Sequence, residues 1–236
     1  MTPAFRRDPY ASHVTATVET GDAGGIRLAD TVFFPEGGGQ PGDTGRLVWD
    51  GGETPIVDAR KADGPDTVVH IPAEDAPSPP AGTEVRAELD WPRRHRLMRM
   101  HTALHLLCSV IDGAVTGGQI GETKSRLDFN IGSEKPDKQA LSDALNRLVG
   151  EDHPVGARYV DAATLAEQPE LVRTMSVQPP ADASGRVRLV EIGTVDLQPC
   201  GGTHVAGTGE IGALSVGKIE SKGRANRRIN IHLSDG

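Results

Sequence analysis

Cysteine and aromatic residues are scarce in this chain of 236 residues, and each scarcity excludes a class of protein. The two cysteines, Cys108 and Cys200, are too few for the disulfide framework of a small secreted domain. They fit a reducing compartment, in which a cysteine serves as a metal ligand, a catalyst or a core residue. Aromatic residues make up only 3% of the chain, which leaves few platforms for stacking.

Long apolar runs are also missing. No stretch of 18 apolar residues occurs, and the first ten residues, MTPAFRRDPY, lack the apolar segment of a secretory signal. The net charge of −8 argues against a generally basic coat for nucleic acid, although a local basic patch remains compatible with it. We therefore expect a cytoplasmic protein with no membrane segment, and nothing in the sequence indicates an obligate protein partner.

The chain is rich in glycine (29) and proline (17), which favours turns and short strands. Alternating or short apolar stretches predict six strands, at Ser12–Glu19, Gly25–Phe34, Gly45–Trp49, Thr54–Asp58, Thr67–Ile71 and Glu84–Leu89. Six short strands without a long helical pattern favour a small β-barrel. The proline-rich loop Pro72–Gly82 lies near a domain boundary, so we assign residues 1–89 to a β-barrel domain.

The pattern changes to helix at Asp90, a suitable N-cap with Pro92 in the first turn. Apolar and potential ligand residues then recur at helical spacing as far as Gly113: Leu97, His101, Leu104, His105, Cys108 and Ile111. Further elements are predicted, namely helices at about Pro136–Leu148 and Asp161–Gln168 and strands at Arg186–Ile192, Glu210–Lys218 and Arg228–Leu233. The mixture has no regular βαβ rhythm, so residues 90–236 are expected to form an α+β domain.

Four residues form a candidate metal site. His101 and His105 are spaced i, i+4 and share a helix face, about 6 Å apart at Cβ. Cys200 and His204 flank a short segment with two glycines. Alone, the first pair fits one buried and one surface histidine, and the second fits a glycine-rich turn. Together they form a tetrahedral N/S donor set that suits one Zn²⁺ per chain, and Cys108 is expected to be a core residue. A zinc peptidase is disfavoured, because Thr102 stands where that motif needs glutamate.

Two other stretches allow both a structural and a functional interpretation. Three glycines, Gly37–Gly39, precede Gln40. They indicate either a flexible hairpin tip or a segment whose backbone comes close to a ligand. Residues 218–228 carry five basic residues and one acid, which indicates either a solvated turn or a phosphate contact.

Motifs spread along the chain resemble a known family. RMHTALHLL, SRLDFN, CGGTHVAGTGEIG and KGRANRRI, in this order, are similar to the editing domain of alanyl-tRNA synthetase. FFPEGGGQPGDTG resembles the segment that precedes that domain. The chain has no room for an aminoacylation domain, so it is similar to the free-standing editing homologues, the AlaX proteins, in their medium-length form. The resemblance covers about residues 5–233.

The resemblance implies a fold and an activity. The fold is a small translation-factor-like β-barrel followed by an α+β editing domain of the threonyl/alanyl-tRNA synthetase type. The activity is hydrolysis of the ester in mischarged tRNA(Ala), chiefly Ser-tRNA(Ala) and secondarily Gly-tRNA(Ala), by zinc-organised water attack. The partner would be the acceptor stem of tRNA(Ala). The residues that match the family's zinc ligands are His101, His105, Cys200 and His204.

Further site residues follow from the same resemblance. Gly38, Gly39 and Gln40 match the family's glycine-rich motif, and we expect this tip to close over the substrate pocket. Leu104 departs from the threonine of many members, so Thr102 or Thr123 is expected to supply a pocket hydroxyl. Phosphate contacts to tRNA are expected from Lys222, Arg224, Arg227 and Arg228. The alternative function is a zinc-stabilised tRNA-binding module without hydrolytic activity, which would leave the ester of Ser-tRNA(Ala) intact.

Overall fold

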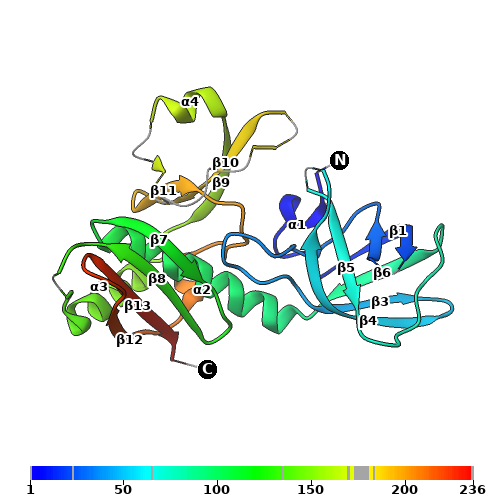
Figure 1. Cartoon of the computed structure of the whole chain (residues 1–236), viewed down its shortest axis with the longest axis horizontal. Coiled ribbons are helices and arrows are strands. Elements are labelled where there is room, and N and C mark those ends of the chain that lie inside the picture. Colours follow the sequence, from blue (N-terminus) through cyan, green and yellow to red (C-terminus); the bar gives the residue numbers. More distant parts are fainter. Residues whose placement is uncertain are drawn as a thin grey trace. The chain divides into compact units, whose positions relative to one another are not determined.

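Antiparallel strands make up most of the regular secondary structure, and they belong to two separate units (Figure 1). A computed structural model describes residues 2–22, 24–64, 66–133, 135–168, 171–172, 181–182 and 184–234. The units are Met1–His95 and Arg96–Gly236, and the helix α2 (Trp91–Val110) contains the boundary between them. None of the helices in the described ranges is long and apolar enough to cross a membrane.

The first unit is a closed six-stranded barrel of order β1-β2-β5-β4-β3-β6. It contains α1 (Ala4–Arg7), β1 (His13–Asp22), β2 (Gly25–Leu28), β3 (Gly45–Trp49), β4 (Gly52–Lys61), β5 (Val68–Pro72) and β6 (Glu84–Leu89). The barrel predicted from the strand pattern is therefore confirmed. The strand expected over Gly25–Phe34 is too long, since pairing ends at Leu28 and Val32, Phe33 and Phe34 are buried in the barrel core outside any strand.

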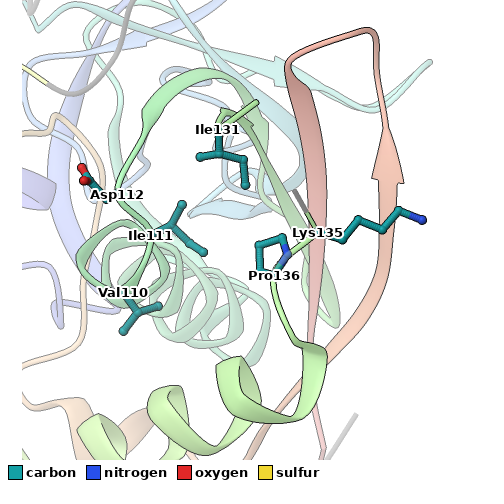
Figure 2. Close-up of a pocket in the computed structure, with 6 residues that line it drawn as sticks. All are labelled: Val110, Ile111, Asp112, Ile131, Lys135 and Pro136. Atoms are coloured by element: carbon teal, nitrogen blue, oxygen red, sulfur yellow. The ribbon is translucent and has the colours of Figure 1, made fainter. Parts of the chain in front are cut away.

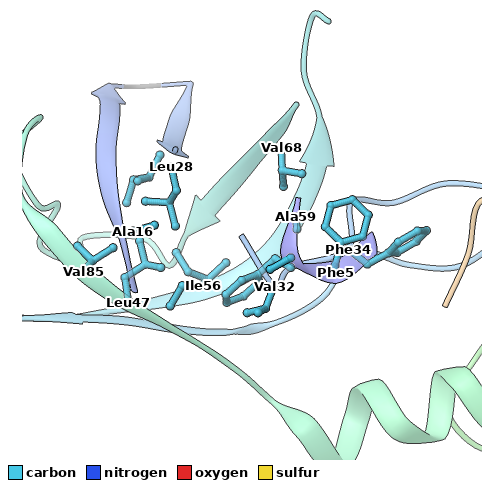
Figure 3. Close-up of a cluster of buried hydrophobic side chains, with 14 of the residues drawn as sticks. Phe5, Ala16, Leu28, Val32, Phe34, Leu47, Ile56, Ala59, Val68 and Val85 are labelled. Atoms are coloured by element: carbon cyan, nitrogen blue, oxygen red, sulfur yellow. The ribbon is translucent and has the colours of Figure 1, made fainter. Parts of the chain in front are cut away.

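Apolar side chains fill the barrel interior (Figure 3). Alternation along β1 places Ala16 and Val18 inside, and Leu47 on β3 and Val85 on β6 join them.

The loop that follows Phe34 is fixed by a buried ion pair. Arg94, fully buried, donates from Nε to both oxygens of Asp43 at 3.0 and 2.9 Å, and Asp43 accepts the Phe34 N–H.

The second unit is α+β, as predicted, with two antiparallel sheets. Besides the rest of α2, it contains β7 (Ala114–Gln119), β8 (Lys124–Asn130), α3 (Lys138–Gly150), β9 (Val155–Asp161), α4 (Ala162–Ala166), β10 (Arg186–Ile192), β11 (Asp196–Pro199), the 3₁₀ helix η2 (Thr208–Ile211), β12 (Leu214–Ser221) and β13 (Asn226–Leu233). One sheet has the order β12-β13-β8-β7 and the other β11-β10-β9.

Several elements of this unit differ from the prediction. Four strands, β7, β8, β9 and β11, were not predicted. β7 contains Gly117 and Gly118, and β9 is mostly exposed, so neither strand shows a clear apolar alternation. The strand predicted over Glu210–Lys218 starts only at Leu214, because Glu210 lies in η2, where its side chain accepts the N–H groups of Ala206 and Gly207.

The helix α3 protects one edge of the larger sheet. Its N-cap is Asp137, which accepts the Ala140 N–H at 2.7 Å. The Asn146 amide donates to the Leu214 carbonyl at 2.7 Å and accepts its N–H at 2.9 Å. A side chain thus takes the place of a neighbouring strand along the edge of β12.

Candidate metal centre

Helix α2 carries the first pair of candidate ligands. It begins as predicted, with the Asp90 carboxylate accepting the Arg93 N–H at 3.2 Å. His101 and His105 then lie one turn apart, with ring centroids separated by 5.5 Å. Both are buried, as is Cys108 one turn further on. A helix buried along this stretch holds the two imidazoles in fixed positions.

The loop after β11 carries the second pair. Arg188 on β10 holds this loop: its carbonyl accepts the Cys200 N–H at 3.1 Å, and its guanidinium donates to the carbonyls of Cys200 and Gly202 at 2.8 and 3.1 Å. The Gly202 N–H points at the Cys200 sulfur, 3.4 Å away. The loop therefore bends back on itself, which brings the His204 ring to the thiol.

The four side chains meet in one cluster. Cys200 Sγ lies 3.4 Å from Nε2 of His101 and 3.3 Å from Nε2 of His204. One donor atom from each residue, including His105, lies within 4.8 Å of the other three. Bond lengths typical of zinc, about 2.0–2.1 Å to nitrogen and about 2.3 Å to sulfur, place tetrahedral donors about 3.3–3.6 Å apart. The cluster can therefore hold a metal ion, and its donor set fits zinc.

Asp196 and Gln198 on β11 fix the orientation of His105. Nδ1 of His105 donates to Asp196 Oδ2 at 2.8 Å, and the Gln198 amide donates to the same oxygen at 2.9 Å. With Nδ1 carrying the proton, Nε2 of His105 is the nitrogen available to a metal. Sequence reasoning missed both residues, although their alternation on one strand just before Cys200 was a usable signal.

Thr102 supports His204 in a similar way. Its hydroxyl is fully buried, donates to the Met98 carbonyl at 3.0 Å, and accepts the Val205 N–H at 3.3 Å. Nδ1 of His204 lies 3.2 Å from the same oxygen, which leaves Nε2 of His204 directed at Cys200. Thr102, predicted to line the substrate pocket, therefore has its hydroxyl engaged by neighbouring protein groups.

The electrostatics of the cluster favour the metal-binding form of the cysteine. Burial opposes the Cys200 thiolate, but His101 and His204 outweigh it and hold the thiol pKa well below its usual value. Burial also opposes the charged form of His105, yet its hydrogen bonds to Asp196 and Cys200 raise its pKa to about 9. A metal ion taking Nε2 of His105 therefore displaces a proton, so metal binding is expected to depend on pH.

The remaining predicted residues of this unit lie in the larger sheet and its turns. Thr123 is exposed just before β8, and its carbonyl accepts the Leu233 N–H at 3.2 Å. Lys222 and Arg224 are exposed in the β12–β13 turn. Arg227 is buried and donates to the carbonyls of Gly223 and Asn226 at 3.2 and 2.9 Å. Arg228 forms two hydrogen bonds of 2.8 Å to Asp128.

The glycine motif lies in the first unit as a tight turn. Gly37 and Gln40 exchange backbone hydrogen bonds of 3.0 and 3.1 Å, and Gly38 and Gly39 have φ of +61° and +83°. Positive φ at both central positions is the type I′ geometry that glycine favours. Gln40 itself is buried. The segment thus forms a hydrogen-bonded turn.

Comparisons with known proteins show which families the chain is similar to. Residues 187–230 match the family described as threonyl and alanyl tRNA synthetase second additional domain. Residues 8–93 match the family described as tRNA synthetases class II (A). The alanyl-tRNA editing protein AlaX-M of Methanosarcina acetivorans is 38% identical over 238 residues, which cover 97% of each chain. AlaX-M of Methanosarcina barkeri is 39% identical over 237 residues, again 97% of each chain. The alanine–tRNA ligase of Pyrobaculum neutrophilum is 34% identical over 92% of this chain but only 25% of its own length.

Proposed function

Because the chain belongs to the AlaX-M family of alanyl-tRNA editing proteins, we propose that it is a hydrolase that removes wrong amino acids from tRNA(Ala). The substrates are chiefly Ser-tRNA(Ala) and secondarily Gly-tRNA(Ala), and the scissile bond is the ester at the terminal adenosine. The observation that carries the proposal is the cluster of three imidazoles and one thiol, with its supporting hydrogen bonds. We assign the editing chemistry to residues 90–236 and a translation-factor-like barrel to residues 1–89.

The residues that would hold one zinc ion are His101, His105, Cys200 and His204. When bound, zinc supplies Lewis-acid polarisation of the ester carbonyl or of the attacking water. Nε2 of His105 and of His204 face the cluster while Nδ1 is engaged by Asp196 and Thr102, so neither histidine acts as the general base. Cys200 is partly exposed whereas the three histidines of the cluster are buried, and we place the approach of the ester on its side.

Pocket and tRNA contacts complete the proposal. Gly38, Gly39 and Gln40 are proposed to recognise the aminoacyl group, because a turn built on positive φ lets the backbone approach a ligand closely. Thr123 is the remaining candidate for a pocket hydroxyl, since that of Thr102 is engaged. The exposed Lys222 and Arg224 are proposed to contact phosphates directly. Arg227 acts mainly by shaping the hairpin, because its guanidinium donates to backbone carbonyls within it. Arg228 is held by Asp128 on β8 and keeps further N–H donors for a phosphate.

The first test is deacylation in trans. Wild-type protein is expected to release serine from Ser-tRNA(Ala) and to leave Ala-tRNA(Ala) largely intact. Cys200→Ala removes one of four ligands, so zinc content and deacylation should both fall, the rate by roughly a hundredfold or more. Cys108→Ala, a change of the second cysteine, which is buried and lies outside the cluster, is the matched control and should retain both.

Each outcome separates the proposal from its alternative. A wild-type protein that binds tRNA and zinc but leaves every ester intact would be a zinc-stabilised RNA-binding module. Deacylation by Cys200→Ala at the wild-type rate would show that the cluster takes no part in the reaction.

A further inference from the structure

The larger sheet has a polar face that the proposed chemistry does not use. In the strand register of this sheet, Gln119 on β7 pairs with Arg126 on β8, and Arg126 pairs with Asn230 on β13. Two residues along, Asp128 pairs with Arg228, which pairs with Glu220 on β12. Residues two apart on a strand share a face, so all six side chains lie on one side. The intervening residues, such as Leu127 and Ile229, are buried.

A cavity of about 340 Å³ opens on this face. The residues that line it are Gln119, Ile120, Gly121, Lys124, Ser125, Arg126, Glu220, Arg228 and Asn230. Its charged side chains are three cations and one carboxylate, in a chain whose net charge is −8. No residue of the metal cluster lines it, and the strands around it supply none of the four ligands. Asp128, which pairs with two of these cations, lies on the same face, so three cations stand against two carboxylates and the cavity is a separate site with a small excess of positive charge.

The cations of this cavity keep donors available. The Asp128 carboxylate accepts hydrogen bonds from Nε and Nη2 of Arg228 and from Nη1 of Arg126. A guanidinium has five N–H groups in total, so both arginines retain donors after this pairing. The Lys124 ammonium has no hydrogen-bond or ion-pair partner among the residues that the structure describes. Asp128 thus holds the two guanidinium groups in place and leaves some of their N–H groups available to donate hydrogen bonds to a ligand.

The lining chemistry selects the class of ligand. Lysine and arginine donors match phosphate oxygens, and the exposed amide of Gln119 suits a ribose hydroxyl. No aromatic side chain lines the cavity, so it offers no surface for base stacking. We propose that this cavity binds the phosphate–ribose backbone of the RNA substrate, independently of base sequence. The proposal rests on tRNA being the substrate, and it adds a contact site beyond the metal centre and the β12–β13 turn.

Binding of uncharged tRNA tests the proposal without requiring hydrolysis. Lys124→Gln and Arg126→Gln should each weaken binding of tRNA(Ala) and of an unrelated tRNA equally, by about fivefold. Each should also reduce the slope of log affinity against log salt by about 1. Deacylation at saturating tRNA should keep its wild-type kcat, because neither residue lies in the metal centre.

The matched control is a lysine in another cavity of the same unit. Lys135 borders a space of about 230 Å³ with Val110, Ile111, Asp112, Ile131 and Pro136 (Figure 2). Lys135→Gln makes the same charge change on a mainly aliphatic lining and should leave tRNA affinity unchanged. Equal weakening by Lys135→Gln, or unchanged affinity in the Lys124 and Arg126 variants, would overturn the proposal.

A further binding experiment distinguishes RNA from small phosphate compounds as the ligand of this cavity. Inorganic phosphate and AMP, titrated into the protein, should bind only at millimolar concentration, because each offers one phosphate group. Micromolar binding of either compound that is lost in Arg126→Gln, with tRNA affinity intact, would assign the cavity to a free phosphate ligand and overturn the RNA assignment. A wild-type protein that binds tRNA through this cavity but never deacylates it would contradict the proposed function alone.

Discussion

A single carboxylate, Asp196, determines which nitrogen of His105 faces the metal cluster. It is buried, it accepts from both His105 and Gln198 through Oδ2, and its Oδ1 has no partner among the described residues. Carboxylates behind histidine ligands fix the ring orientation and raise the basicity of the metal-facing nitrogen. At the residue scale, we therefore expect metal affinity to depend on a group that contributes no donor atom to the cluster.

Asp196→Asn tests this dependence. The variant keeps the shape of the side chain but loses its charge, so zinc affinity should fall by about 10- to 100-fold. Competition with a chelator measures the affinity, and the absorption spectrum of the cobalt-substituted protein reports the ligand geometry. Asp143→Asn, an exposed carboxylate on α3, is the control. Wild-type zinc affinity in Asp196→Asn would reduce Asp196 to a packing role.

At the scale of elements, the barrel strands enclose a buried polar pair. His70 on β5 is fully buried, with Nδ1 donating to the Ile26 carbonyl at 2.9 Å and Nε2 accepting from the Thr31 hydroxyl at 2.7 Å. Burial lowers the pKa of His70 to about 4, although the hydrogen bond to Ile26 works in the opposite direction. The barrel core therefore requires the neutral imidazole.

Acid is expected to destabilise the barrel through this histidine. Below its ordinary pKa of 6.5 the unfolded chain takes up a proton that the folded barrel accepts only near pH 4. The contribution to stability is complete above pH 6.5 and is lost as the pH falls to 4, by about 3 kcal/mol for a shift of this size. Urea unfolding followed by the fluorescence of Trp49 and Trp91, both in the first unit, measures it.

His70→Gln can keep both hydrogen bonds but cannot titrate, so its unfolding free energy should fall less between pH 6.5 and 4 than that of the wild type. His13→Gln, at an exposed position on β1, is the control and should follow the wild type. Parallel pH curves for wild type and His70→Gln would show that another group causes the acid sensitivity.

At the scale of the whole molecule, both units carry residues proposed for one reaction. The glycine turn with Gln40 belongs to the first unit, and the metal cluster belongs to the second. Gln40→Ala should lower the deacylation rate or the preference for serine over alanine by about fivefold, equivalent to one hydrogen bond of about 1 kcal/mol. Zinc content and tRNA affinity should stay near wild type. Gln139→Ala, an exposed residue on α3, is the control, and a kinetically silent Gln40→Ala would remove the turn from the reaction.

The sequence predicted those features that depend on local spacing. The helix that begins after Asp90 follows from a capping residue and a 3.6-residue period, and these also place His101 and His105 on one face. The barrel follows from short strands between glycine and proline turns. By contrast, β9 and β7 were missed, because an exposed strand and a glycine-containing strand lack the alternation that reveals a half-buried one.

The sequence by itself thus determined the four cluster residues and the type of fold, because their spacing and residue types define a donor set within short segments. Only the tertiary structure decided what surrounds them. Asp196 reaches His105 across 91 positions, and Thr102 reaches His204 across 102, through strand register and loop packing that no local pattern encodes. The same holds for Arg227, whose burial depends on how the β12–β13 hairpin closes. Partners distant in the chain are set by the packing of whole elements, and this packing turns a spacing of histidines into an oriented cluster that can hold a metal ion.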